Sequence, residues 1–145
     1  MHDSSTIALQ DAPAIPGLVF RHYRGAADLP IIAAVVNASM AADKMSERTT
    51  AEELANSYAH TFHWNPQQDA LLAEVNATLI GYANTHWREE HEARPHFINL
   101  HLAPEWRGRG LELAMQRHME RRVEGLVLGD KVAIVGDGHR CIVDR

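Results

Sequence analysis

The chain has 145 residues, of which 46% are hydrophobic and one is cysteine, and this composition predicts one globular domain that needs neither disulfides nor a structural metal. Its formal net charge of -5 argues against general nucleic-acid binding, although a local site for a small anion remains possible. The lone Cys141 fits a reducing compartment, and no apolar run reaches the about 18 residues of a membrane span. These features predict a cytoplasmic protein without a membrane or nucleic-acid partner.

The first part of the chain is expected to be a flexible lead-in over residues 1–17, where prolines and a glycine are spaced among small and polar residues. A single folded domain is expected over residues 18–145. It opens with a predicted strand over residues 18–24, in which β-branched and aromatic residues alternate imperfectly before a glycine.

Two helices are predicted next. Asp28 can cap the first helix, Pro30 fits its first turn, and apolar residues recur on one face at helical spacing. The second helix begins at residues 49–50, because either threonine has a glutamate three residues later and can form a capping box. It is expected to stop before residues 65–66, an Asn-Pro pair. Its apolar face comprises Ala51, Leu54, Ala55, Tyr58 and Phe62.

The middle of the chain predicts three antiparallel strands. Apolar residues 70–75 and 78–87 flank residues 76–77, which favours a hairpin, although alanine is a poor second residue for its usual turn. Charged residues 88–95 predict a second hairpin loop, and residues 97–103 predict the returning strand.

A helix and a short strand are expected to end the fold. The helix carries its apolar face on Leu111, Ala114, Met115, Met119 and Val123, and it ends near Gly125. Residues 132–135 form a continuous apolar run, which favours a strand covered on both faces. The predicted element order is βααβββαβ.

The segment between the third hairpin strand and this last helix carries the strongest functional signal. Gly108 and Gly110 let backbone N–H groups approach a ligand closely, and the helix start adds unsatisfied donors and a partial positive charge. Arg107 and Arg109 add full charges. This combination indicates a site for an anion such as phosphate, and the alternative is a plain helix start with solvated arginines.

The run from Arg107 to Glu112 resembles the Arg/Gln-x-x-Gly-x-Gly/Ala signature of the GNAT family, the acyl-CoA-dependent N-acetyltransferases. The resemblance implies that acetyl-CoA is the cofactor, that the amides of this turn hold its pyrophosphate, and that the Leu102 amide holds the pantetheine arm or polarises the thioester oxygen. Glu112 stands where the family has glycine or alanine, and its carboxylate is expected to crowd or repel the phosphates. The implied cofactor-binding residues are Leu102, Arg107, Gly108, Arg109, Gly110, Leu111 and Glu112.

The resemblance also implies an α+β fold with a mixed, largely antiparallel central sheet flanked by helices. The family normally adds a fourth helix and two strands after the fifth strand, whereas here ten residues follow Val135. The domain is therefore expected to be incomplete at its C-terminus and to lack those elements. An uncovered strand edge offers unpaired N–H and C=O groups, so a homodimer or larger assembly is expected.

A candidate acceptor pocket comes from two neighbouring strands. Asn84 and His86 share one face of their strand with Tyr82, and Asn99 and His101 share one face of the next strand. In amine acetylation a base must take a proton from the acceptor, and imidazole titrates in the required range. We therefore predict His101 and Asn99 as catalytic residues and the other three as substrate-binding residues, the alternative being a face that is polar because it meets water.

Other patterns predict less. No metal is expected, because the pair His60 and His63 and the ladder of residues 86, 91, 96 and 101 lack completing ligands at suitable spacing. Residues 136–138 look like the opening of a dinucleotide-binding turn, but too few residues follow for its helix. The predicted function is acetyl-CoA-dependent acetylation of an unidentified primary amine, on a small molecule or a peptide. The alternative is a non-catalytic module that binds coenzyme A or a partner.

Overall fold

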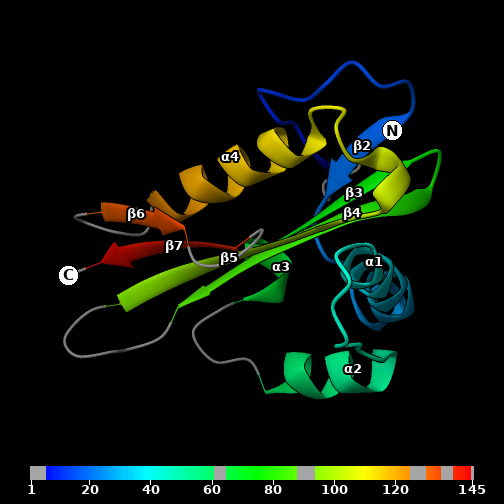
Figure 1. Ribbon diagram of the computed structural model, residues 1–145, viewed down its shortest axis with the longest axis horizontal. Helices are drawn as coiled ribbons and strands as arrows, with labels where there is room; N and C mark the ends of the chain where they lie inside the picture. Colours follow the sequence, from blue (N-terminus) through cyan, green and yellow to red (C-terminus); the bar gives the residue numbers. More distant parts are fainter. Residues whose placement is uncertain (1–5, 61–64, 88–93, 125–129, 135–138, 145) are drawn as a thin grey trace.

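The computed structural model describes residues 6–60, 65–87, 94–124, 130–134 and 139–144. A sheet runs through the molecule, with α4 on one face and α1 and α2 on the other (Figure 1). The elements are, in chain order, β1 (Thr6–Ile7), β2 (Leu18–Arg21), η1 (Ala26–Asp28), α1 (Leu29–Ala42), α2 (Ala51–Ala59), α3 (Pro66–Asp69), β3 (Ala70–Val75), β4 (Thr78–Trp87), β5 (Arg94–Leu102), η2 (Pro104–Trp106), α4 (Leu111–Glu124), β6 (Asp130–Ile134) and β7 (His139–Asp144).

The sheet has the order β1-β2-β3-β4-β5-β7-β6, and each neighbouring pair is antiparallel. This arrangement confirms the predicted antiparallel sheet with flanking helices, but the described pairings include no parallel one, so the sheet is not mixed. The structure also differs from the prediction after residue 135. There β7 inserts between β5 and β6, so β6 is an edge strand and the final residues pair with the sheet.

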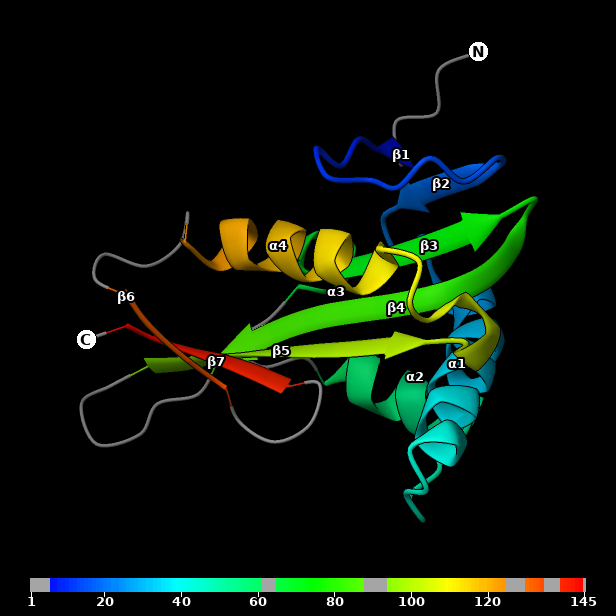
Figure 2. The same ribbon diagram turned by 45° about the horizontal axis from the view of Figure 1, so that its top comes forward.

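The N-terminal segment belongs to the fold from Thr6 onward. β1 pairs with β2, and the side chain of Leu9 is buried in the core under α4. Asp11 accepts a hydrogen bond from Arg121 of α4 at 3.2 Å. Figure 2 shows this segment running beside β2 and α4. The expected lead-in is therefore held by apolar burial and an ion pair that local sequence patterns do not reveal.

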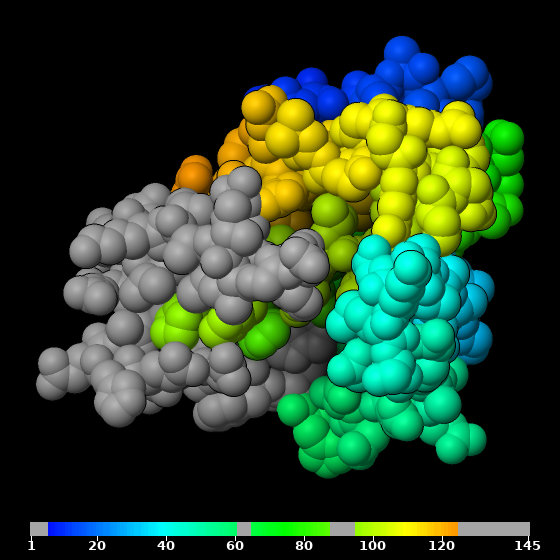
Figure 3. Space-filling view, viewed as in Figure 1, coloured from blue at the N-terminus to red at the C-terminus, as the bar shows by residue number. Residues whose placement is uncertain are grey.

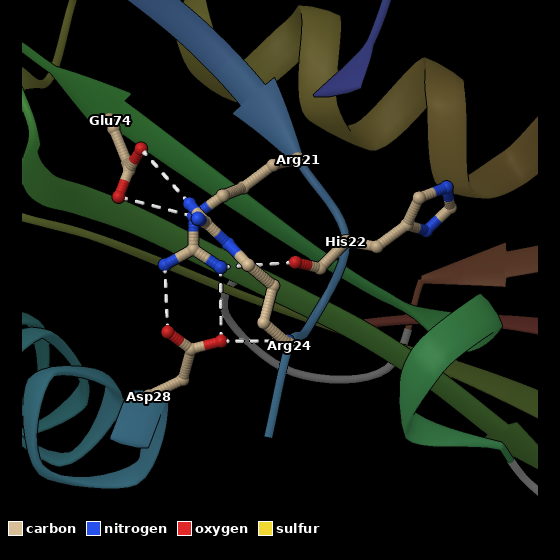
Figure 4. Close-up of polar contacts among 5 residues, drawn as sticks. All are labelled: Arg21, His22, Arg24, Asp28 and Glu74. Carbon is tan, nitrogen blue, oxygen red and sulfur yellow. Dashed lines mark hydrogen bonds and ion pairs between the residues drawn. The ribbon is translucent and has the colours of Figure 1, made fainter. Parts of the chain in front are cut away.

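Asp28 precedes α1 as predicted, but its carboxylate does not cap the helix. It accepts hydrogen bonds from Arg21 at 2.8 and 3.0 Å and from the Arg24 backbone at 2.8 Å, and Glu74 lies 3.1 Å from Arg21 Nε (Figure 4). Burial opposes the charge of Asp28, but these hydrogen bonds outweigh it and lower the pKa of Asp28. In Figure 4 the ring of His22 points away from the ion pairs.

The second helix begins as predicted, because Thr50 accepts a hydrogen bond from the Glu53 amide at 3.0 Å. It ends at Ala59, earlier than expected, and Phe62 lies outside the described residues. Asn65 does not simply stop it: its side chain accepts from Gln67 N and caps α3.

The hairpin of β3 and β4 turns at Asn76 and Ala77, as predicted, with φ of 50° and 67°. Both residues have the left-handed conformation that the tight two-residue turn requires. The register of β3 against β4 shifts between Ala73 and Glu74, which marks a β-bulge in the pair.

Apolar side chains form one core on each face of the sheet. The larger core includes Leu71, Ala83 and Ile98 from the strands with Leu111 and Met115 from α4. The core under α1 comprises Ile32, Val35, Val36, Ala70, Leu72, Leu79 and Tyr82, with Tyr23, Met40, Leu54 and Tyr58 against it. Of the helices in the described part of the chain, none is long and apolar enough to cross a membrane.

Candidate functional site

The turn before α4 has the backbone of an anion site. Gly108 and Gly110 have φ of 76° and 90°, a conformation that favours glycine, and a Cβ added at Gly108 would meet nothing within 4 Å. α4 then runs for 14 residues, with its first turn closed by the bond from Ala114 N to Gly110 O at 3.2 Å. The turn therefore leaves room for a ligand beside backbone donors of a long helix.

One of these donors already holds an anionic oxygen. Glu112 Oε2 accepts a hydrogen bond from the Gly108 amide at 3.1 Å. Glu112 thus reaches back over the turn, at the position where the sequence predicts conflict with phosphate. The contact indicates that the turn amide suits an anionic oxygen, and that a ligand using this amide has to displace the carboxylate.

Arg107 directs its charge toward the end of α1. Its guanidinium donates to Asp43 Oδ1 at 2.7 Å and to the carbonyl and hydroxyl oxygens of Ser39 at 3.1 and 3.0 Å. Figure 3 shows the yellow turn region resting on the cyan end of α1. The side chain therefore ties the turn to α1. The Arg107 backbone amide donates to Pro104 O at 3.2 Å, so a ligand that used this amide would have to displace that bond.

Arg109 is held differently. Its guanidinium carbon lies 4.9 Å from the centre of the Trp106 ring, and the residue is exposed. This cation–π contact keeps a positive charge beside the turn. Of the two arginines, Arg109 is therefore the one whose charge is not ion-paired to α1.

The pairing of β4 with β5 brings together four of the five polar residues predicted for the acceptor pocket. Tyr82 lies opposite His101, and Asn84 lies opposite Asn99. Asn99 Nδ2 donates to Asn84 Oδ1 at 2.9 Å, and Asn84 Nδ2 donates to the Tyr82 hydroxyl at 2.9 Å. Tyr82 is buried and the other three are half-buried, so this part of the face is covered and does not simply meet water.

His86 lies on the same face but outside this hydrogen-bonded row. It is paired with Phe97 across the strands, and their rings stack with centres 5.4 Å apart. Its substrate-binding role stays a prediction.

Tyr58 of α2 extends the row and was not predicted as a site residue. Its hydroxyl is hydrogen-bonded to that of Tyr82, and its ring centre lies 4.9 Å from that of Tyr23. Burial raises the pKa of both Tyr58 and Tyr82, so both hydroxyls are protonated at neutral pH. The helical period placed Tyr58 on the apolar face of α2, but no pattern in the sequence indicates that this face meets β4.

A cavity of about 370 Å³ joins the end of the polar row to the turn. In Figure 3, β5 atoms are recessed between α4 and the end of α1. The cavity is lined by Ser39, Met40, Asp43, Met45, Asn99, Leu100, His101, Leu102, Arg107 and Glu112. The predicted catalytic residues and three of the predicted cofactor-binding residues therefore share one cavity.

The described residues contain no group of three or more His, Cys, Asp or Glu side chains that could hold a metal ion. His60 is 2.9 Å from the Asn56 carbonyl oxygen through Nδ1, and His96 is buried beside Trp87. His63 and His91 lie outside the described residues, as does the glycine pattern of residues 136–138.

Comparison with known proteins identifies the family. The model of the Acetyltransferase (GNAT) family matches residues 38–133, so the chain belongs to this family. This range includes the turn and every residue of the polar row. A search among curated proteins finds no significant match.

Solved structures share the fold. A GCN5-related N-acetyltransferase from Sphaerobacter thermophilus matches with a TM-score of 0.60 and 20% identity over 75% of this chain, which spans 33% of that protein. The protein yncA of Salmonella typhimurium, determined with its cofactor acetyl-CoA, matches with a TM-score of 0.54 and 17% identity over 88% of this chain and 92% of its own. A GNAT acetyltransferase from Streptococcus pneumoniae matches with a TM-score of 0.50 and 16% identity, over 87% and 97%.

Proposed function

We propose that this chain is an acetyl-CoA-dependent N-acetyltransferase that acts on a primary amine. The observation that carries the proposal is the shared cavity, whose lining includes Arg107 and Glu112 of the turn as well as Asn99 and His101. A donor held at the turn and an acceptor held at the polar row would therefore meet in one space.

The backbone of the turn suits the cofactor. Coenzyme A carries a pyrophosphate, and the Gly108 amide already holds a carboxylate oxygen, while Arg109 adds an exposed positive charge. We assign cofactor binding to the backbone from residue 107 to residue 112 and to the Leu102 amide. When bound, acetyl-CoA supplies an acetyl thioester that is reactive toward an amine.

The polar row would prepare the acceptor. An ammonium group has to lose a proton before its nitrogen can attack a carbonyl carbon, and the imidazole of His101 is the candidate base in the cavity. Asn99, Asn84 and Tyr82 would hold the acceptor through polar contacts. His101 lies directly opposite Tyr82 across the strands, so the two residues share one sheet face, which supports these proposed roles.

Calorimetric titration with coenzyme A tests the cofactor half of the proposal. The Gly108→Ala variant places a methyl group where the turn faces open space, and we expect coenzyme A to bind at least roughly tenfold more weakly. Gly25→Ala is the matched control, because Gly25 also has positive φ and open surroundings but lies outside the turn. Absence of coenzyme A binding to the parental chain would overturn the proposal.

Thiol release from acetyl-CoA with a panel of small primary amines and a lysine peptide tests the catalytic half. We expect His101→Ala to lower kcat by roughly a hundredfold. A parental rate in this variant would exclude His101 as the base. Binding of coenzyme A without release of thiol would favour the alternative, a non-catalytic binding module.

A further inference from the structure

We infer that Tyr58 is a positioning residue, which orients the side-chain amide of Asn99 so that its carbonyl oxygen faces the acceptor amine. The inference rests on the proposed function and deepens it, because it states how the cavity would recognise an N–H donor. It concerns a residue of α2 that no sequence pattern connects with the site.

The hydrogen bonds form a chain from α2 to the cavity. The Tyr58 hydroxyl meets the Tyr82 hydroxyl, Asn84 Nδ2 donates to Tyr82 at 2.9 Å, and Asn99 Nδ2 donates to Asn84 Oδ1 at 2.9 Å. Asn99 is also one of the residues that line the 370 Å³ cavity. The chain uses the Asn99 amino group, and the Asn99 carbonyl oxygen is the atom that it leaves for a ligand.

The direction of each bond follows from the donors present. An amide Nδ2 can only donate, so the Tyr82 oxygen accepts from Asn84. Either hydroxyl can donate in the Tyr58–Tyr82 bond, and donation from Tyr82 to Tyr58 is the direction that gives the Tyr82 proton a partner. In this arrangement Tyr58 is the acceptor for the Tyr82 proton. Burial raises the pKa of both tyrosines, so both remain neutral hydroxyls in this arrangement.

Removal of the Tyr58 hydroxyl is expected to reverse the chain. We expect the Asn84 amide to turn, so that its carbonyl oxygen accepts the Tyr82 proton and its amino group donates toward Asn99. The Asn99 amide would turn as well: its carbonyl oxygen would accept from Asn84, and its amino group would face the cavity. An acceptor amine or ammonium would then meet a donor in place of an acceptor, and a mismatched donor in a buried site costs binding energy.

The lining of the cavity agrees with a cationic acceptor. Asp43 and Glu112 bring two carboxylates to it, whereas Arg107 brings one guanidinium, which is ion-paired with Asp43. The ligand class that fits a carbonyl oxygen in this surrounding is a small aliphatic ammonium compound, whose N–H groups donate and whose charge opposes the surplus of carboxylates.

Steady-state kinetics of Tyr58→Phe tests the inference, with the amine that the parental chain acetylates fastest as the probe. We expect the KM for that amine to rise at least tenfold, while the dissociation constant for coenzyme A stays unchanged by calorimetry. Binding of the same amine to the coenzyme A complex, measured by calorimetry, should weaken by the same factor. Tyr23→Phe is the matched control, since the Tyr23 ring packs against the Tyr58 ring but is not part of the hydrogen-bonded chain.

A rescue separates positioning from mere structure. Asn99→Asp offers acceptor oxygens on both sides, so the Tyr58→Phe/Asn99→Asp double variant should recover most of the lost amine affinity, since its chain no longer has to be oriented. Failure of this rescue, or an unchanged KM in Tyr58→Phe, would overturn the inference while coenzyme A binding upholds the proposed function. Absence of coenzyme A binding or of any amine turnover in the parental chain would overturn both.

Discussion

At the scale of single residues, the turn is defined by what its charged side chains already contact. The Glu112 carboxylate accepts from the Gly108 amide, and Arg107 is bound to Ser39 and Asp43. These groups of the turn thus already have protein partners, and a cofactor phosphate would replace the Glu112 carboxylate on the Gly108 amide. Affinity for coenzyme A should therefore depend on how readily Glu112 leaves.

Glu112→Gln is expected to tighten coenzyme A binding by roughly tenfold, because it removes a negative charge and weakens a charge-assisted hydrogen bond that competes for the amide. Calorimetric titration of coenzyme A measures the change. Glu124→Gln, at the far end of the same helix, changes the net charge equally and serves as the control. Equal dissociation constants for the two variants would show that Glu112 does not compete with the cofactor.

At the scale of elements, the β3–β4 hairpin contains an avoidable strain. Ala77 has φ of 67°, a conformation that carries a steric cost for any residue with a Cβ. Ala77→Gly should raise the free energy of unfolding by about 1 kcal/mol, as measured by urea denaturation.

Ala55→Gly is a comparison variant that we expect to lower the free energy of unfolding. Ala55 is exposed within α2, where glycine lowers stability by about 1 kcal/mol because of its backbone entropy. A destabilised Ala77→Gly variant would contradict the account of strain at Ala77.

The junction of β2, β3 and η1 depends on an ion pair. Arg21 and Asp28 are both buried, and Glu74 lies on the other side of the guanidinium. In Asp28→Asn the buried Arg21 cation therefore loses one of these two carboxylate partners. The variant should lose about 3 kcal/mol of unfolding free energy at neutral pH.

The loss in Asp28→Asn should depend on pH in a defined direction. The pKa of Asp28 is lowered in the fold, so its contribution is complete above the unfolded value of about 3.9 and disappears as the pH falls through the folded value. Urea denaturation of both proteins across a pH series should show their stabilities converging below about pH 4. A difference that is constant down to acid pH would contradict the ion-pair account.

At the scale of the whole molecule, the ends of the sheet determine how copies could associate. β6 is an edge strand, and a strand edge presents unpaired backbone groups. We expect a homodimer or larger assembly that pairs through β6. Light scattering over a dilution series should show dissociation, and amide hydrogen exchange of residues 130–134 should slow as concentration rises. A monomer at every concentration would contradict the expectation.

Much of the architecture is determined by local sequence. Periodicity predicts α1 and α4, the Thr50 capping box predicts the start of α2, and the apolar runs around residues 76–77 predict the hairpin. These signals are reliable because a helix face, a cap or a two-residue turn depends on neighbours within about one or two turns of chain. The turn motif of residues 107–112 is likewise readable, since its glycines are required by the backbone.

Contacts between distant segments were decided only by the tertiary structure. The parity of β4 and β5 predicted that the polar residues would share a face, but it did not predict that Tyr58 of α2 would complete their hydrogen bonds. The Glu112 and Arg107 contacts, the pairing of β1 with β2 and the insertion of β7 beside β5 were equally unpredicted. Each depends on the packing of elements in three dimensions, where side-chain partners are chosen by burial and shape, and no periodicity along the chain encodes that choice.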